Sequence, residues 1–155
     1  AKALLACESI TPAHSAVFDV LEAALLPLGF TVDRSIVGSA PDGPVENLLA
    51  TRGGRGTHLA FAGHLDVVPP GEGWTSGAFT PEVRGGLLHG RGAVDMKGAI
   101  AAFVAAIPVE PGIPLSLIIT GDEEGPAIFG TRALIERMAE NGVRPDLCLV
   151  GSPTK

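Results

Sequence analysis

Short apolar runs alternate with helical stretches in the second half of this 155-residue chain, and this alternation limits the fold most. Residues 58–62, 114–120 and 146–150 form runs of strand length, and the last two are expected to be buried. Residues 96–107, which are rich in alanine, and residues 128–141 are expected to form helices. Strands that alternate with helices predict an α/β fold, with a mainly parallel central sheet flanked by helices.

The first half of the chain predicts one long helix and two further strands. Thr11 is suited to cap a helix whose first residue is Pro12, and Gly29 is suited to end it. Residues 30–37 and 47–51 are expected to be strands. The remaining expected element is a small β-hairpin with strands at residues 79–83 and 87–89.

Length, charge and cysteine content restrict the class of protein. A chain of this length suits one domain or part of one. The formal net charge is −6 and the basic residues are scattered, which argues against a nucleic acid or an anionic membrane surface as partner. No apolar run approaches the roughly 20 residues of a membrane-spanning helix. Cys7 and Cys148 stand among apolar residues, so we expect buried free thiols and a reducing, cytoplasmic location.

Polar clusters stand where the expected strands end or a helix begins. His64 and Asp66 follow the first of the three apolar runs, residues 122–124 follow the second, and Ser152 follows the third. Asp95 stands at the start of the alanine-rich helix. Ligands bind beyond the carboxyl ends of parallel strands. We therefore expect all these positions to gather at one edge of the sheet.

Each cluster has a structural and a chemical interpretation. His64 could be a hydrogen-bonded histidine in a turn, Asp95 a helix N-cap, and residues 122–124 a solvated acidic turn. Alternatively, imidazole and carboxylates at one edge hold a divalent cation, and one acid remains as a general base. Three consecutive acids repel one another unless cations offset them, which favours the chemical interpretation. Adjacent Glu123 and Glu124 point apart, so they cannot share one role.

Four segments, in this order and at these separations, resemble the dinuclear-zinc aminoacylase and carboxypeptidase family. They are residues 63–69 (GHLDVVP), 74–75 (WT), 90–98 (GRGAVDMKG) and 120–125 (TGDEEG). The resemblance implies a zinc-exopeptidase-like fold. Residues 121–127 are most similar to the desuccinylase branch of that family, and residues 9–12 (SITP) point the same way.

The resemblance also implies a role for each candidate residue. His64 would bind one metal ion, Glu124 a second, and Asp95 would bridge both. Glu123 would be the general base that activates water, and Asp66 would orient His64. The implied cofactors are two Zn²⁺ ions in the complete enzyme, or Co²⁺ in their place.

The implied reaction is hydrolysis of the amide bond of N-succinyl-L,L-diaminopimelate to succinate and L,L-diaminopimelate, a step toward lysine and cell-wall precursors. N-acetylornithine or another N-acyl amino acid is the alternative substrate. The implied partners are therefore a small-molecule N-acyl amino acid and, for the complete enzyme, a second copy in a homodimer.

Two features depart from the family pattern. The family has a glutamate ligand where this chain has Ser152, and a neutral hydroxyl is a weak zinc ligand. Family members are also much longer. Residues 1–155 would form the N-terminal portion of the catalytic domain, without the dimerisation domain and the C-terminal catalytic half. We therefore expect that the isolated chain cannot complete either metal site, and a non-catalytic module that keeps the fold is the alternative.

Overall fold

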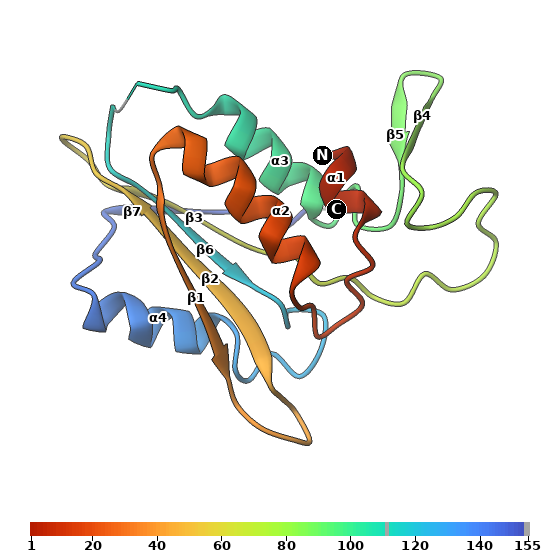
Figure 1. The fold of residues 1–155 in the computed structure, drawn as a ribbon, viewed down its shortest axis with the longest axis horizontal. Coiled ribbons are helices and arrows are strands. Elements are labelled where there is room, and N and C mark those ends of the chain that lie inside the picture. The colour runs from red at the N-terminus through yellow and green to blue at the C-terminus, as the bar shows by residue number, and fades with distance from the viewer. Residues whose placement is uncertain (111, 154–155) are drawn as a thin grey trace.

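Five strands form one sheet at the centre of the computed structural model, which describes residues 1–110 and 112–153 (Figure 1). Across the sheet, the strands lie in the order β1, β2, β6, β3, β7. Their bounds are Thr31–Val37 (β1), Val45–Arg52 (β2), Leu59–His64 (β3), Leu115–Thr120 (β6) and Leu147–Val150 (β7). β3 pairs in parallel with β6 and β7, whereas β2 pairs antiparallel with β1 and β6. Only β2 therefore runs against the other strands of this sheet, and the prediction of a mainly parallel sheet is confirmed.

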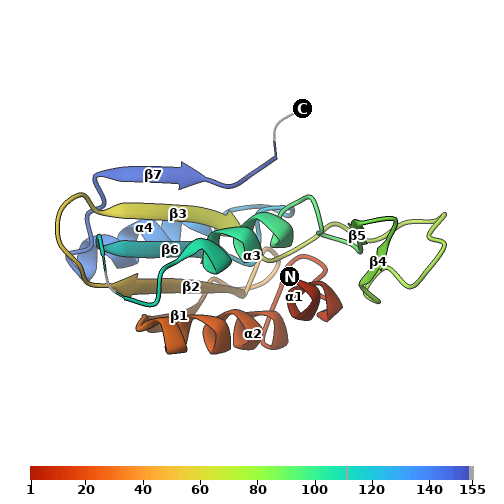
Figure 2. The same cartoon turned by 90° about the horizontal axis from the view of Figure 1, so that it is seen from above.

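Helices cover both faces of this sheet, as Figure 2 shows. α1, α2, the short 3-10 turn η1 and α3 lie on one face, and α4 lies on the other. Their bounds are Lys2–Ala6 (α1), Ala16–Leu25 (α2), Leu26–Leu28 (η1), Lys97–Ala106 (α3) and Thr131–Glu140 (α4). Among the described residues, none of the helices combines the length and hydrophobicity that crossing a bilayer requires.

The side chains of β6 contribute to the core on both faces of the sheet. Leu117 and Ile119 belong to the same buried cluster as Phe18 of α2. Ile118, between them, packs in a second cluster with Leu134 of α4. Because successive side chains of a strand point to opposite faces, a strand covered on both sides must be apolar throughout. The continuous apolar run in the sequence has this physical cause.

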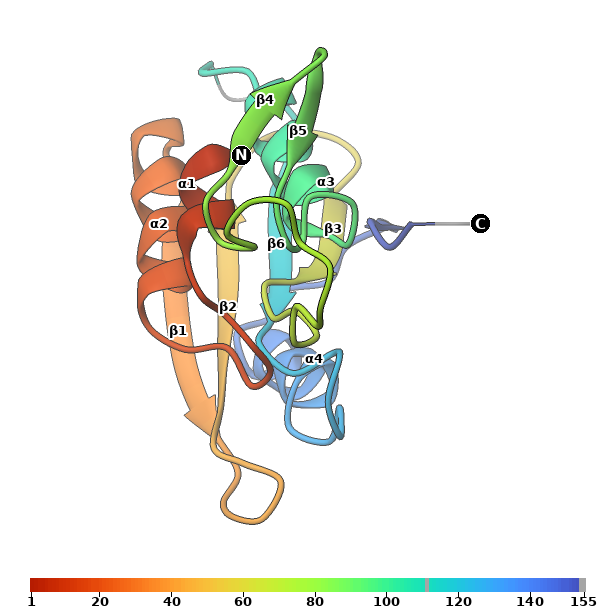
Figure 3. The same ribbon diagram turned by 90° about the vertical axis from the view of Figure 1, so that its right-hand side faces the viewer.

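A separate two-stranded hairpin projects beyond the sheet (Figure 3). It consists of β4 (Glu82–Arg84) and β5 (Leu87–His89). Gly85 and Gly86, which join the strands, have φ angles of 57° and 78°. Two-residue hairpin turns require this left-handed region, which favours glycine. The predicted hairpin is confirmed, although its first strand begins at Glu82 rather than at residue 79.

The helix that was expected to begin at Pro12, with Thr11 as its cap, is present but begins later. α2 begins instead at Ala16. The backbone N–H of Thr11 donates to the carbonyl of Val67 at 3.1 Å, and that of Ala13 donates to the carbonyl of Gly121 at 2.7 Å. The predicted start was wrong because these distant partners satisfy the backbone and hold it against the loops after β3 and β6.

β7 is exposed, although its sequence predicted a buried strand. Leu147, Leu149 and Val150 are 60%, 52% and 65% exposed, because β7 lies at the end of the sheet. An apolar run of four residues does not reveal whether its faces are covered. Cys148 is correspondingly exposed and Cys7 is half-buried, so the prediction of two buried thiols was also wrong, although both thiols are free.

Candidate metal centre

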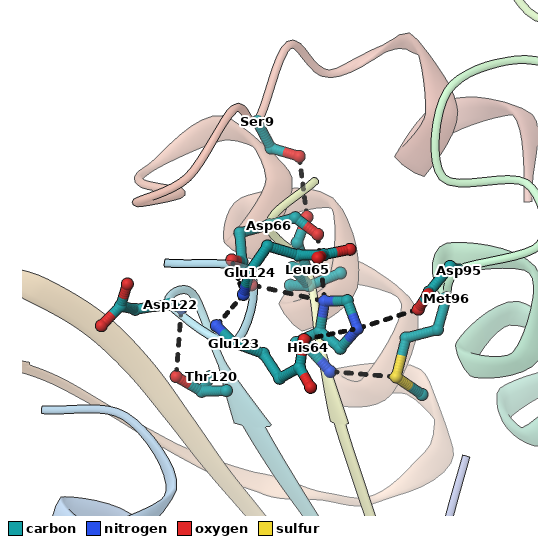
Figure 4. A network of polar contacts seen from close by, with 10 residues as sticks. All are labelled: Ser9, His64, Leu65, Asp66, Asp95, Met96, Thr120, Asp122, Glu123 and Glu124. Atoms are coloured by element: carbon teal, nitrogen blue, oxygen red, sulfur yellow. Dashed lines mark hydrogen bonds and ion pairs between the residues drawn. The ribbon is translucent and has the colours of Figure 1, made fainter. Parts of the chain in front are cut away.

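The candidate residues gather where β3 and β6 end at the same edge of the sheet (Figure 4). His64, the last residue of β3, pairs with Thr120, the last residue of β6. The backbone N–H of Leu65 donates to the carbonyl of Thr120 at 2.9 Å, so the loops that follow the two strands start side by side. Parallel pairing in this register therefore brings polar residues that are distant in the sequence to one place.

The structure brings His64, Asp95 and Glu124 together. Each offers a possible ligand atom, and these atoms all lie within 4.8 Å of one another. His64 is buried, whereas Asp95 and Glu124 are half-buried. Nε2 of His64 lies 3.1 Å from Oδ1 of Asp95 and 3.7 Å from Oε2 of Glu123. Because the side chain of Glu123 is 52% exposed, its carboxylate remains accessible from solvent.

Asp95 does not cap α3, although its place in the sequence allowed that interpretation. The N-cap residue of α3 is Met96, whose side chain makes no capping hydrogen bond. The sulfur of Met96 instead accepts the backbone N–H of His64 at 3.3 Å. The carboxylate of Asp95 faces the imidazole, as Figure 4 shows, so the interpretation of Asp95 as a helix cap was wrong.

Asp66 is completely buried and contacts both loops of the centre. Its backbone carbonyl lies 3.0 Å from Nδ1 of His64, and its carboxylate oxygen lies 3.4 Å from the same nitrogen. Its two carboxylate oxygens also accept the backbone N–H groups of Glu123 at 3.1 Å and Glu124 at 2.9 Å. Asp66 therefore fixes the loop that carries the acidic residues as well as the imidazole.

The close carboxylates change the charge of the imidazole in the metal-free chain. Burial lowers the pKa of His64, but the hydrogen bond to Asp66 and the charges of Asp66 and Glu123 raise it more, to about 9. Burial raises the pKa of Asp66, but the contact with His64 and the two backbone N–H donors hold it below its ordinary value. Burial and neighbouring carboxylates raise the pKa of Glu124. The centre therefore attracts positive charge, which a proton on His64 supplies when no cation is bound.

The metal-free chain should lose stability as the pH rises from neutral. Folding raises the pKa of His64 from 6.5 to about 9, so its contribution is complete below pH 6.5 and is lost as the pH passes through 9. A shift of this size corresponds to up to about 3 kcal/mol of unfolding free energy. Urea unfolding on both sides of this pH window measures the loss. His64→Gln should remove most of this loss of stability. An equal pH dependence in the parent chain and in His64→Gln would contradict the assignment of the loss to His64.

The chain near Asp95 leaves no space for a side chain at Gly98, where a Cβ atom would overlap with the carbonyl oxygen of Ala93. Gly98→Ala should therefore lower the free energy of unfolding by about 1–3 kcal/mol. Gly53→Ala is the matched control, because no heavy atom lies within 4 Å of its new Cβ. Its effect should stay within about 0.5 kcal/mol in the same denaturant titration. Equal stabilities of the two variants would refute this close contact.

Ser152 lies just beyond β7, at the sheet edge where the parallel strand β3 ends in His64. The backbone N–H of the preceding Gly151 donates to the carbonyl of Ala62 at 3.0 Å, which continues the parallel pairing. The side chain of Ser152 is exposed. A serine hydroxyl at this position adds no negative charge to the centre.

Sequence analysis missed Ser9 and Lys97 as neighbours of the centre. Both are buried. Oγ of Ser9 donates to the carbonyl of Leu65 at 2.7 Å, and Nζ of Lys97 donates to the carbonyl of Cys7 at 3.0 Å. Their acceptors are backbone carbonyls distant in the sequence, which no local pattern reveals. The available signal was that both stand within segments that carry the resemblance, Ser9 in residues 9–12 and Lys97 in residues 90–98.

Comparisons with known proteins agree with this geometry. Residues 60–155 match the model of peptidase family M20/M25/M40. Relatives named succinyl-diaminopimelate desuccinylase are 72% identical in Sphingopyxis alaskensis and 65% identical in Rhizorhabdus wittichii, over 99% and 97% of this chain. The chain spans only 42% and 41% of those two proteins. The crystal structure of human carnosine dipeptidase 1 has a TM-score of 0.82 and 26% identity, covering 99% of this chain and 38% of the other.

The family match extends over most of the chain and includes His64, Asp95, Glu123 and Glu124. The structural match extends over nearly all of it and confirms the predicted exopeptidase-like fold. The chain therefore belongs to peptidase family M20/M25/M40.

Proposed function

We propose that this chain forms the N-terminal part of the catalytic domain of a metal-dependent amide hydrolase. The proposed substrate is N-succinyl-L,L-diaminopimelate, which would be cleaved to succinate and L,L-diaminopimelate. The observation that carries the proposal is the convergence of His64, Asp95 and Glu124 within 4.8 Å. The substrate rests on the names of the two relatives that are 72% and 65% identical. A homodimer is proposed for the longer protein.

The donor set fits a divalent cation. One imidazole and two carboxylates are ligands that Zn²⁺ and Co²⁺ accept, and the raised pKa of His64 reflects surplus negative charge around it. By the resemblance, His64 would hold one Zn²⁺ ion, Glu124 would hold a second, and Asp95 would contribute to both. When bound, Zn²⁺ would supply Lewis acidity that polarises the amide carbonyl and makes water a stronger nucleophile.

The residues of the chain orient the ligands and move the proton. The backbone carbonyl of Asp66 contacts Nδ1 of His64, so Nε2, the other ring nitrogen, faces Asp95. Glu123 is accessible, and its Oε2 lies 3.7 Å from Nε2 of His64. Its carboxylate would take a proton from the attacking water and pass that proton to the leaving amine. Asp66 holds the backbone of Glu123, so it fixes where this base stands.

The isolated chain should hold metal only weakly. Three ligands gather in it, and Ser152 supplies no carboxylate at the edge where the resemblance places one more ligand. Calorimetric titration of residues 1–155 with Co²⁺ should therefore give weak binding that His64→Gln abolishes. Ser152→Glu should increase the affinity, because a carboxylate replaces a weak neutral donor. No Co²⁺ binding by either the parent chain or Ser152→Glu would favour a non-catalytic module or a metal site that the isolated chain leaves incomplete.

The proposed activity is best tested in a longer protein, which we call the hybrid. It consists of residues 1–155 joined to the remaining part of the Sphingopyxis alaskensis relative, of which this chain covers 42%. With Zn²⁺ or Co²⁺ supplied, the hybrid should release succinate from N-succinyl-L,L-diaminopimelate. N-acetylornithine, assayed in parallel, tests the alternative substrate. Release of acetate without release of succinate would overturn the proposed substrate but not the reaction class.

A further inference from the structure

The N-terminal segment 7–13 contacts the loops after β3 and β6 and also the first residue of α3, which stands two residues after Asp95. We propose that this segment, which we call the strap, is a positioning element that sets the distances among His64, Asp95 and Glu124. The identity of the centre rests on the proposed function, whereas the mechanical role of the strap rests on hydrogen bonds within the chain. The strap lies between α1 and α2, the region in which sequence analysis had expected the helix to begin.

The first attachment of the strap is to the loop after β3. Oγ of buried Ser9 donates to the carbonyl of Leu65 at 2.7 Å. The backbone N–H of Val67 donates to the carbonyl of Ser9 at 2.9 Å, and that of Thr11 donates to the carbonyl of Val67 at 3.1 Å. These three hydrogen bonds lie on both sides of Asp66. They therefore restrain Asp66, which contacts the imidazole of His64 and the backbone N–H groups of Glu123 and Glu124.

The second attachment is to the residue that follows β6. The backbone N–H of Ala13 donates to the carbonyl of Gly121 at 2.7 Å, and the N–H of Gly121 donates to the carbonyl of Glu46 at 3.0 Å. A Cβ atom at Gly121 would lie 2.6 Å and 2.9 Å from the carbonyl oxygens of Ala13 and Glu46. Only glycine therefore allows this close approach. It fixes the backbone three residues before Glu124.

The third attachment is to the first residue of α3, two residues after Asp95. Lys97 is fully buried, and its Nζ donates to the carbonyl of Cys7 at 3.0 Å. The charge of Asp66 also attracts this ammonium group. A buried charge is costly to desolvate, and a positive charge near a cation site opposes cation binding. The contact with the strap gives a physical reason for a lysine at this place.

The inference is that the three loops share one support. Residues after β3, after β6 and at the start of α3 are each attached to the strap, and Asp66 joins the first two loops directly. Loss of one attachment should therefore loosen the other loops, even where their own contacts are unchanged. Ordinary local packing predicts instead that each loss affects only its own neighbours.

Amide hydrogen exchange of the metal-free 155-residue chain tests this coupling. Lys97→Met keeps the length of the buried side chain but removes the hydrogen bond to Cys7. The amides of Glu123 and Glu124, which donate to Asp66 and not to the strap, should exchange roughly fivefold faster or more. Ser9→Ala should have the same effect.

Ser116→Ala is the matched control for loss of a buried hydroxyl. Oγ of Ser116 lies 2.8 Å from Nε2 of His58, near the opposite end of β6 from Thr120. This variant should leave the exchange of the Glu123 and Glu124 amides unchanged once each rate is compared with global stability. The proposed role of the strap would be wrong if the Glu123 and Glu124 amides exchanged at unchanged rates in Lys97→Met and Ser9→Ala. It would also be wrong if Ser116→Ala accelerated their exchange equally.

Co²⁺ affinity tests the strap independently, because the two explanations of Lys97 predict changes of affinity in opposite directions. If Lys97 acted only through its charge, Lys97→Met would bind Co²⁺ more tightly. A positioning role predicts weaker binding, by roughly fivefold or more. Tighter binding would overturn the positioning role. If the parent chain took up no Co²⁺ at all, the proposed function would be in doubt, while the exchange experiment would still decide the role of the strap.

Discussion

Replacing Glu123 by Gln in the hybrid should lower the rate of succinate release by about 10²–10⁴-fold and leave Co²⁺ affinity nearly unchanged. The carboxylate of Glu123 is exposed and stands 3.7 Å from Nε2 of His64. The amide of glutamine has the same shape but cannot accept and return a proton. Because Glu123 is not one of the three clustered ligand residues, the substitution should spare metal uptake.

Steady-state assays and calorimetry on the same preparations separate these two effects. Glu124→Gln, one residue away, should lose both activity and Co²⁺ affinity because it removes a proposed ligand. Glu136→Gln on α4 is the matched control, since it removes another exposed acid, on the opposite face of the sheet from α3. A rate for Glu123→Gln close to that of Glu136→Gln would show that Glu123 is not the base.

The sequence was sufficient to predict the sheet and the convergence at its edge, because these depend on local patterns. The apolar run that became β6 predicted a strand buried on both faces, and Ile118 and Ile119 occupy opposite faces as expected. The positions of His64 and Glu124 just after two parallel strands then required them to meet. Four short motifs also sufficed to indicate the family.

The failures share one physical cause, which is dependence on partners distant in the sequence. Thr11 followed by proline is a common start of a helix, but the N–H of Thr11 has a tertiary acceptor in Val67. Asp95 precedes a helix and yet faces His64 instead of capping it. Cys148 was expected to be buried because its neighbours are apolar, although the strand that carries it ends the sheet.

The second role of Asp66 has the same origin. Its spacing from His64 predicted the contact with the imidazole, since residues two apart in an extended segment point to the same side. No spacing predicts that its carboxylate also accepts the N–H groups of Glu123 and Glu124. That contact exists because β3 and β6 are adjacent in the sheet.

Asp66→Ala should lower the free energy of unfolding by about 3–5 kcal/mol, the typical effect of breaking a buried charged network by removing one partner. Asp66 is completely buried, and its loss leaves two backbone N–H groups without their acceptor and removes the carboxylate beside the imidazole. Urea unfolding near neutral pH measures the change. Asp66→Asn should have a smaller effect, because one amide oxygen can still accept a hydrogen bond.

Asp33→Ala provides the matched control for the loss of an aspartate. Asp33 forms an ion pair with Arg137 at 2.7 Å on the surface, where such pairs contribute under about 1 kcal/mol. Acidification gives a further test of Asp66. Because the pKa of Asp66 is held below its ordinary value, its contribution is complete above the unfolded pKa and is lost as the pH falls. Asp66→Ala should therefore lose less stability on acidification than the parent chain. Near neutral pH, equal effects of Asp66→Ala and Asp33→Ala on the free energy of unfolding would refute the role of Asp66 as the link between the two loops.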